Sequence, residues 1–110
     1  MTREEVEVAA FALPAVTKVI QWGASDVYKV GGKVFAICGE GLSFKVSEIG
    51  FLALTEGGPG RQAPYCAKGQ WVNVHLDDMN AEDLGSWLSS AHSLIAAKLT
   101  RKLRAELGLA

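Results

Sequence analysis

The sequence predicts an α+β fold in which helices pack on one face of an antiparallel β-sheet. Two observations support this class. The stretch from Asp26 to Ser47 contains three short apolar runs separated by two Gly-centred reversals, Gly31-Gly32 and Gly39-Glu40-Gly41. Runs of this kind, with two or three turn residues between them, are typical of consecutive β-hairpins. Helical patterns at both ends of the chain can then cover one face of the sheet.

The N-terminal segment predicts a helix. Thr2 and Glu5 have the spacing of a capping box, in which each side chain bonds the other residue's backbone N–H. An apolar stripe at helical spacing follows, and Pro14 ends the helix because the residue before a proline disfavours the α region. The stripe consists of Val6, Ala9, Ala10 and Leu13.

The middle of the chain predicts strands. Residues 16–22 form a first strand, and a turn at residues 23–26 leads into the meander. In the last run of the meander, Leu42, Phe44 and Val46 alternate with Ser43, Lys45 and Ser47, so one face is apolar and the other polar.

Ser47 is the expected N-cap of a short helix through Leu54, which Gly57-Gly58 ends. Residues 57–64 are rich in Gly and Pro and are expected to be a loop. Residues 71–76 then form a strand with Val72, Val74 and Leu76 inward and Trp71, Asn73 and His75 outward.

The C-terminal segment predicts one long helix. Asn80 is its N-cap, and an apolar face continues to Gly108, about six to seven turns at 3.6 residues per turn. The expected order is therefore α-β-β-β-β-α-β-α, in a single domain covering residues 1–110.

Composition sets limits on function. The formal net charge is −1, so a role in binding nucleic acid must depend on a local basic patch. The acidic N-terminus lacks the pattern of a secretory signal, and no window is apolar enough for a membrane span. Cys38 and Cys66 have no CxxC partner, which favours reduced, buried thiols over a disulfide. We expect a soluble cytoplasmic monomer with no membrane partner.

Residues that could support catalysis or bind a metal are scattered. Cys38, Cys66, His75 and His92 lack the paired spacing of structural zinc sites. The chain has no nucleophile elbow, and Gly57 to Arg61 lacks the spacing of a phosphate-binding loop. His92, on the last helix, is expected to be a partly buried, hydrogen-bonded residue. We therefore expect no enzyme activity, catalytic residue, cofactor or metal.

Two features remain. Trp71 is expected to project from the solvent side of the sheet beside Lys45, with Tyr28, Lys29 or Lys33 added according to register. It either belongs to a recognition surface that combines stacking with charge, or merely covers the sheet edge. The basic residues at the C-terminus either contact phosphates or complement the negative end of the helix dipole. They are Lys98, Arg101, Lys102 and Arg104.

Several segments resemble the MmcQ/YjbR family of small bacterial proteins. They are Leu13-Pro14, Val30 to Ala36, Leu42 to Val46, Ala63-Pro64-Tyr65, Gly69 to Val72, and the helix end Lys98 to Lys102. The resemblance implies a CyaY-like (bacterial frataxin) fold and DNA binding through paired β-hairpins likened to two wings. The chain departs from the family at Ala91-His92, where Ser-Tyr is usual.

Two functions follow as hypotheses. The first is a non-enzymatic protein that binds DNA weakly and in a salt-sensitive manner through its hairpins and exposed sheet face. Its expected contact residues are Lys33, Lys45, Trp71, Lys98, Arg101 and Lys102. The alternative is a protein–protein interaction module that uses the exposed sheet around Trp71.

Overall fold

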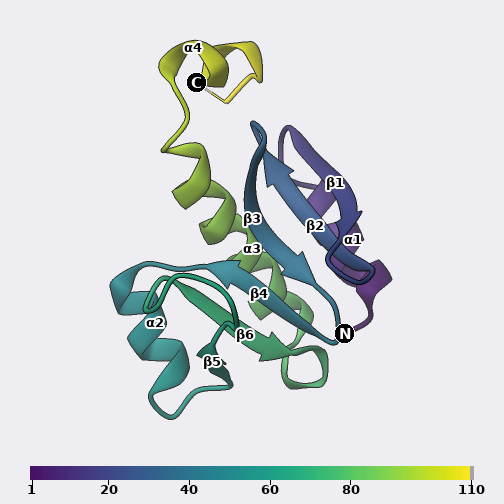
Figure 1. Ribbon diagram of the computed structural model, residues 1–110, viewed down its shortest axis with the longest axis vertical. Coiled ribbons are helices and arrows are strands. Elements are labelled where there is room, and N and C mark those ends of the chain that lie inside the picture. Colours follow the sequence, from purple (N-terminus) through teal and green to yellow (C-terminus); the bar gives the residue numbers. More distant parts are fainter. Residues whose placement is uncertain (110) are drawn as a thin grey trace.

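The computed structural model describes residues 1–109, which form one antiparallel sheet and a layer of helices (Figure 1). The strands are β1 (Val16–Gln21), β2 (Ser25–Val30), β3 (Lys33–Cys38), β4 (Gly41–Lys45), β5 (Gly60–Gln62) and β6 (Trp71–His75). The helices are α1 (Arg3–Phe11), α2 (Glu48–Thr55), α3 (Ala81–Ala96) and α4 (Arg101–Glu106), with a 3₁₀ turn, η1, at Leu76–Asp78. The strand order is β1-β2-β3-β4-β6-β5.

The helices cover one face of the sheet. Helix α3 packs across β2, β3 and β4 and also contacts α1, whereas α2 packs against β5 and β6 (Figure 1). The core lies between these layers, and its largest fully buried side chains are Tyr28, Phe35, Phe44, Leu42, Leu84 and Leu88. The predicted α+β class, with helices on one face of an antiparallel sheet, is confirmed.

Side-chain caps begin the helices where the sequence predicts. The capping box of Thr2 and Glu5 is formed, and the Ser47 hydroxyl accepts a hydrogen bond from the Gly50 N–H at 3.0 Å. The Asn80 side chain accepts from the Asp83 N–H at 2.8 Å. These bonds satisfy backbone donors that have no partner inside the helix.

A β-bulge in β3 places two consecutive residues on the core face. Tyr28 pairs with Ala36 and Lys29 pairs with Val34, so Phe35 is the extra residue. Phe35 and Ala36 are both fully buried in the core, and the Phe35 ring meets the His92 ring of α3 edge-on. Val34 and Ile37 consequently share the opposite face although they lie three positions apart.

The prediction that residues 57–64 form only a loop is wrong. Gly60–Gln62 is the edge strand β5, paired with β6 from Gly60↔Val74 to Gln62↔Val72. A Cβ at Gly60 would lie 2.4 Å from the Val72 Cγ1, so only glycine permits this approach. The strand is stabilised by pairing with the next strand of the chain across the 63–70 loop, and the composition of residues 57–64 gives no sign of this pairing.

The prediction of one continuous C-terminal helix is also wrong. Helix α3 ends at Ala96, and α4 begins after Thr100, whose hydroxyl accepts from the Leu103 N–H at 3.1 Å. The break lets Leu99 turn inward against Gly31 at the tip of the β2–β3 hairpin. Helix α4 stands at one end of the long axis (Figure 1). Within residues 1–109, none of the helices combines the length and apolar character that crossing a bilayer requires.

The contact between Gly31 and Leu99 predicts a difference between neighbouring glycines. Both Gly31 and Gly32 have positive φ, but a Cβ at Gly31 would lie 2.6 Å from the Leu99 Cδ1, whereas one at Gly32 meets nothing within 4 Å. We expect Gly32→Ala to cost about 1–2 kcal/mol of backbone strain. Gly31→Ala should cost about 1 kcal/mol more through overpacking. Urea denaturation measures both, and equal losses would contradict the contact.

The hydroxyl of Tyr28 leads to a second prediction. The side chain is fully buried, its ring meets the Phe11 ring edge-on, and its hydroxyl has no hydrogen-bond partner among the described residues. An unsatisfied buried hydroxyl costs about 1–3 kcal/mol of desolvation. Tyr28→Phe removes that cost and should leave the free energy of unfolding unchanged or raise it. A loss above about 1 kcal/mol would show that the hydroxyl has a native partner.

Candidate binding groove on the open face of the sheet

The face of the sheet away from the helices, here called the open face, is defined by strand register. Val72 and Val74 are buried against the helices, so Asn73 between them points to the other side. Directly paired residues share a face. The open face therefore continues from Asn73 through Ser43 to Ile37.

A groove of about 840 Å³ occupies this face. Trp22 from the β1–β2 turn, Tyr65 from the loop over residues 63–70, and Trp71 from β6 contribute aromatic walls. Val34 and Ile37, brought to this face by the bulge, add apolar surface. The volume lies in the range of pockets that enclose small molecules.

The 63–70 loop is tied to the sheet through the side chain of Gln62. Its Nε2 donates to the Ala63 carbonyl at 2.9 Å, and its Oε1 accepts from the Gly69 N–H at 2.9 Å. The Ala63 N–H also donates to the Trp71 carbonyl at 3.2 Å. These bonds give the loop a defined course along the edge of the open face.

Two of the aromatic residues occupy left-handed backbone conformations. Trp22 has φ +49° and Tyr65 has φ +63°, a region that costs non-glycine residues about 1–2 kcal/mol each. Both rings are held in solvent, since Trp22 is 64% exposed and Tyr65 is fully exposed. Exposed rings on a strained backbone are uncommon in positions that serve only packing.

The floor of the groove is polar. Ser43 and Asn73 are partners across β4 and β6, and the Asn73 Nδ2 donates to the Ser43 Oγ at 3.0 Å. Asn73 lies over Gly41, where a Cβ would be 2.8 Å from its Oδ1. Within residues 1–109, the Asn73 Oδ1 accepts no hydrogen bond, so it remains available as an acceptor.

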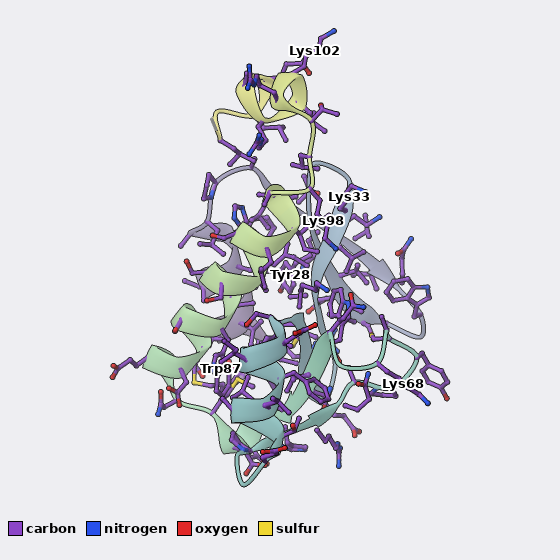
Figure 2. All side chains as sticks on the ribbon, turned by 90° about the vertical axis from the view of Figure 1, so that its left-hand side faces the viewer. Tyr28, Lys33, Lys68, Trp87, Lys98 and Lys102 are labelled. Carbon is purple, nitrogen blue, oxygen red and sulfur yellow. The ribbon has the colours of Figure 1, made fainter. Side chains whose placement is uncertain are left out.

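Charge is divided between the two sides of the sheet. Lys29 is the partner of Val34 and Arg61 is the partner of Asn73, which places both cations on the open face. Lys68 lies on the loop, on the side opposite Trp87 of the helical layer (Figure 2). Among the described residues that line the groove, Glu40 is the one acid. The helices and η1 carry most of the acids, together with the cations Arg3, Arg101, Lys102 and Arg104. The acids are Glu4, Glu5, Glu7, Glu48, Asp77, Asp78, Glu82, Asp83 and Glu106.

Lys45 is not the free surface cation that the sequence suggests. Its register opposite Trp71 gives the predicted face, but the residue is 8% exposed. Its Nζ donates to the Gln70 Oε1 at 2.7 Å. Burial, and secondly the nearby Lys98 charge, lowers the pKa of Lys45. The loop that shapes the groove thus covers this ammonium.

The other predicted cations lie toward one end of the molecule. Lys33 pairs with the core residue Val30, so it shares the helical side rather than the open face. Tyr28, the other candidate that the sequence offered for the open face beside Lys29, is fully buried in the core under the helices. It lies near Lys98, because the hairpin tip contacts Leu99 (Figure 2). Arg101 and Lys102 follow on α4, with Lys102 at the far end of the molecule (Figure 2). We call Lys33, Lys98, Arg101 and Lys102 the basic end.

The cysteines and histidines have separate environments. Cys38 is buried, and burial raises its pKa to about 11. Cys66 lines the groove, and burial raises its pKa also. The His92 Nε2 lies 2.8 Å from the Pro14 carbonyl oxygen, which confirms a buried, hydrogen-bonded role. Among residues 1–109, no three His, Cys, Asp or Glu side chains are grouped as metal ligands.

Comparison with known proteins identifies the family. The sequence profile of the YjbR family matches residues 11–94, which is well over half of the chain. The chain belongs to the YjbR family. The resemblance drawn from its ordered segments is therefore confirmed.

Two solved structures show how this YjbR-family chain compares in three dimensions. The crystal structure of the Deinococcus radiodurans protein DR2400, described as domain DUF419, is 26% identical with a TM-score of 0.86, covering 99% of this chain and 89% of that one. A Pseudomonas syringae protein is 16% identical with a TM-score of 0.70, covering 86% and 98%, and supports the fold alone. No curated protein matches this chain.

The buried ammonium of Lys45 yields a stability prediction. The pKa of Lys45 is lower in the folded protein than in the unfolded chain. At a pH below both pKa values the lysine is charged in both states, and its burial lowers the free energy of unfolding. The free energy of unfolding then rises as the pH increases through the pKa of the folded state. Lys45→Met keeps the packed stem and removes the desolvated charge. We expect the Tm at pH 7 to rise by about 2–5 °C. Lys68→Met on the exposed loop is the control and should change little; a fall for Lys45→Met would show that the Gln70 bond outweighs desolvation.

Proposed function

We propose that this protein binds nucleic acid weakly, without catalysis, through its open face and basic end. The observation that carries the proposal is the scarcity of acids on the open face, where three cations lie without an acidic partner among residues 1–109. The acids lie mainly on the helical layer, whereas Lys29, Arg61 and Lys68 lie on the side of the groove. A net charge of −1 therefore coexists with a surface that attracts phosphates.

The remaining cations support this orientation. Arg3 and Lys18 are paired with Asp26 and Glu7, whereas Lys29, Arg61 and Lys68 form no ion pair within residues 1–109. Unpaired lysines and arginines can neutralise phosphates and release condensed counterions. Because few cations are involved and the helical layer is acidic, the affinity should be low and fall steeply with salt.

The chemistry of the groove favours binding over catalysis. Its walls are aromatic rings, and its floor offers an amide and a hydroxyl. Burial raises the pKa of the Cys66 thiol, which keeps it protonated and a poor nucleophile near neutral pH. Stacking and hydrogen bonding are the interactions that these groups supply.

A second candidate is a protein partner at the same groove, the alternative that the sequence also suggests. The observation that favours it is the apolar character of Val34, Ile37 and Pro64 beside Trp71. An extended apolar segment could pack there without phosphate contacts. Its binding would be insensitive to salt, which separates it from a polyanion.

Two lysines on opposite faces of the same sheet provide a matched test. Lys29 and Lys18 lie on adjacent strands, but Lys29 faces the groove side and Lys18 pairs with Glu7 of α1. Lys29→Gln should weaken the binding of a labelled oligonucleotide a few-fold at low salt and reduce the slope of log K against log salt by about 0.7–0.9. Lys18→Gln makes the same change in net charge and should leave both quantities nearly unchanged. Fluorescence anisotropy over a salt series measures them.

The basic end is tested in the same assay. Lys33→Gln combined with Lys98→Gln should lower both affinity and salt slope more than Lys29→Gln alone, since two phosphate contacts are removed. Equal effects of Lys18→Gln and Lys29→Gln would contradict the proposed orientation. Absence of any salt-dependent binding by the unaltered protein would overturn the function.

A further inference from the structure

We propose that the groove is a binding pocket for an unpaired nucleobase, so that the protein prefers single-stranded nucleic acid to a duplex. This inference rests on the proposed function and specifies its ligand. It is carried by three observations: the aromatic walls, the polar floor, and the polarity of charge along the groove.

The aromatic walls fit a planar heterocycle. Trp22, Tyr65 and Trp71 come from three separate segments and line one hollow. A flat base can stack on such rings whatever its sequence, because every base presents a π-face. Trp22 and Tyr65 have left-handed backbone conformations and mostly exposed rings, so Trp22 gains little and Tyr65 almost no packing within the protein.

The floor offers groups that match the edge of a base. The Asn73 Oδ1 is free to accept a hydrogen bond. The Ser43 hydroxyl accepts one from the Asn73 Nδ2 and can donate its own proton in a second. Glycine at position 41 makes room for the amide, since any side chain there would collide with it. Base edges carry complementary donors and acceptors, whereas the side chains of an apolar peptide segment carry none.

Charge gives the groove a direction. Val34 lines it beside Lys29, whereas Glu40 lines it with Gly39 and Gly41 at the β3–β4 turn. A nucleotide would place its phosphate near Lys29 and its base over Asn73, away from the carboxylate. In a duplex the bases are stacked and paired inside the helix, so their faces cannot enter a pocket of this size.

The decisive experiment separates the base from the backbone. Fluorescence anisotropy compares a short labelled oligothymidylate, the same backbone with abasic sites throughout, and a duplex of equal length, at one low salt concentration. We expect the oligothymidylate to bind about tenfold more tightly than the abasic strand, given the usual contribution of one stacked base. It should also bind more tightly than the duplex, although the duplex carries more charge.

Variants at the exposed rings locate the effect. Trp22→Ala and Tyr65→Ala remove solvent-held rings without touching the core and should each weaken oligothymidylate binding about five- to tenfold, leaving the abasic strand unaffected. A variant with Trp22→Phe and Trp71→Phe keeps aromatic rings for stacking in the groove, and Trp87 is then its single tryptophan. It should still bind. The quenching of tryptophan fluorescence that we expect the oligothymidylate to cause in the unaltered protein should disappear, because Trp87 is stacked on Phe44 in the helical layer.

The outcomes distinguish the two proposals. Binding of neither strand, with no salt dependence, would overturn the nucleic-acid function. Equal binding of base-containing and abasic strands, or tighter binding of the duplex, would leave that function standing and overturn the base pocket. Titration with adenosine and with an uncharged apolar peptide, followed by NMR, adds a check. Shifts at Asn73 and Trp71 from the peptide alone would assign the groove to a protein segment and overturn the pocket.

Discussion

One-sided burial of the sheet is the constraint on which the rest of this structure depends. Helix α3 packs on β2, β3 and β4, so the side chains that alternate along each strand are divided into a set buried under the helix and a set on the open face. Strand register then extends this division from one strand to the next. Once Val72 and Val74 are inside, Asn73 must be outside, and the pairing of β4 with β6 carries Ser43 to the same place. The groove floor is thus a consequence of what the core requires on the other side.

The sheet alone would present a flat surface, and three additions make it concave. The bulge at Phe35 moves Val34 and Ile37 to the open face while giving the core two consecutive residues. The 63–70 loop, tied by Gln62, raises one wall and at the same time covers Lys45. The turn after β1 adds Trp22 on the other side. The same loop therefore forms a wall of the groove and binds the Lys45 ammonium.

Overall charge is a poor guide to this molecule because its acids are concentrated on one side of the sheet. Acids near helix N-termini are favoured by the helix dipole, which draws them to the helical layer. The ion pairs of Arg3 and Lys18 hold α1 against the strands and use cations on that same side. Cations left without such partners remain on the open face and at the basic end. Local potential, rather than the net value, decides what approaches each face.

The sequence by itself determined the elements whose causes are local. Capping residues, apolar periodicity and Gly-centred turns placed α1, α2, the start of α3 and the first four strands, because these signals act within a few residues. The inward set Val72, Val74 and Leu76 followed from alternation alone. The family was also evident from ordered segments of the chain.

Only the tertiary structure decided where distant segments meet. Strand β5 exists because β6 offers an edge across the 63–70 loop, and the break after α3 accompanies the packing of Leu99 against Gly31 at the far β2–β3 hairpin. Neither contact can be inferred from the residues next to it in the sequence. The same is true of the groove, whose three aromatic rings come from three segments and of which sequence reasoning found Trp71 alone. Local physics specifies which residues form each strand or helix. Which faces come together depends on packing between elements far apart in the chain, and that is settled only in the folded state.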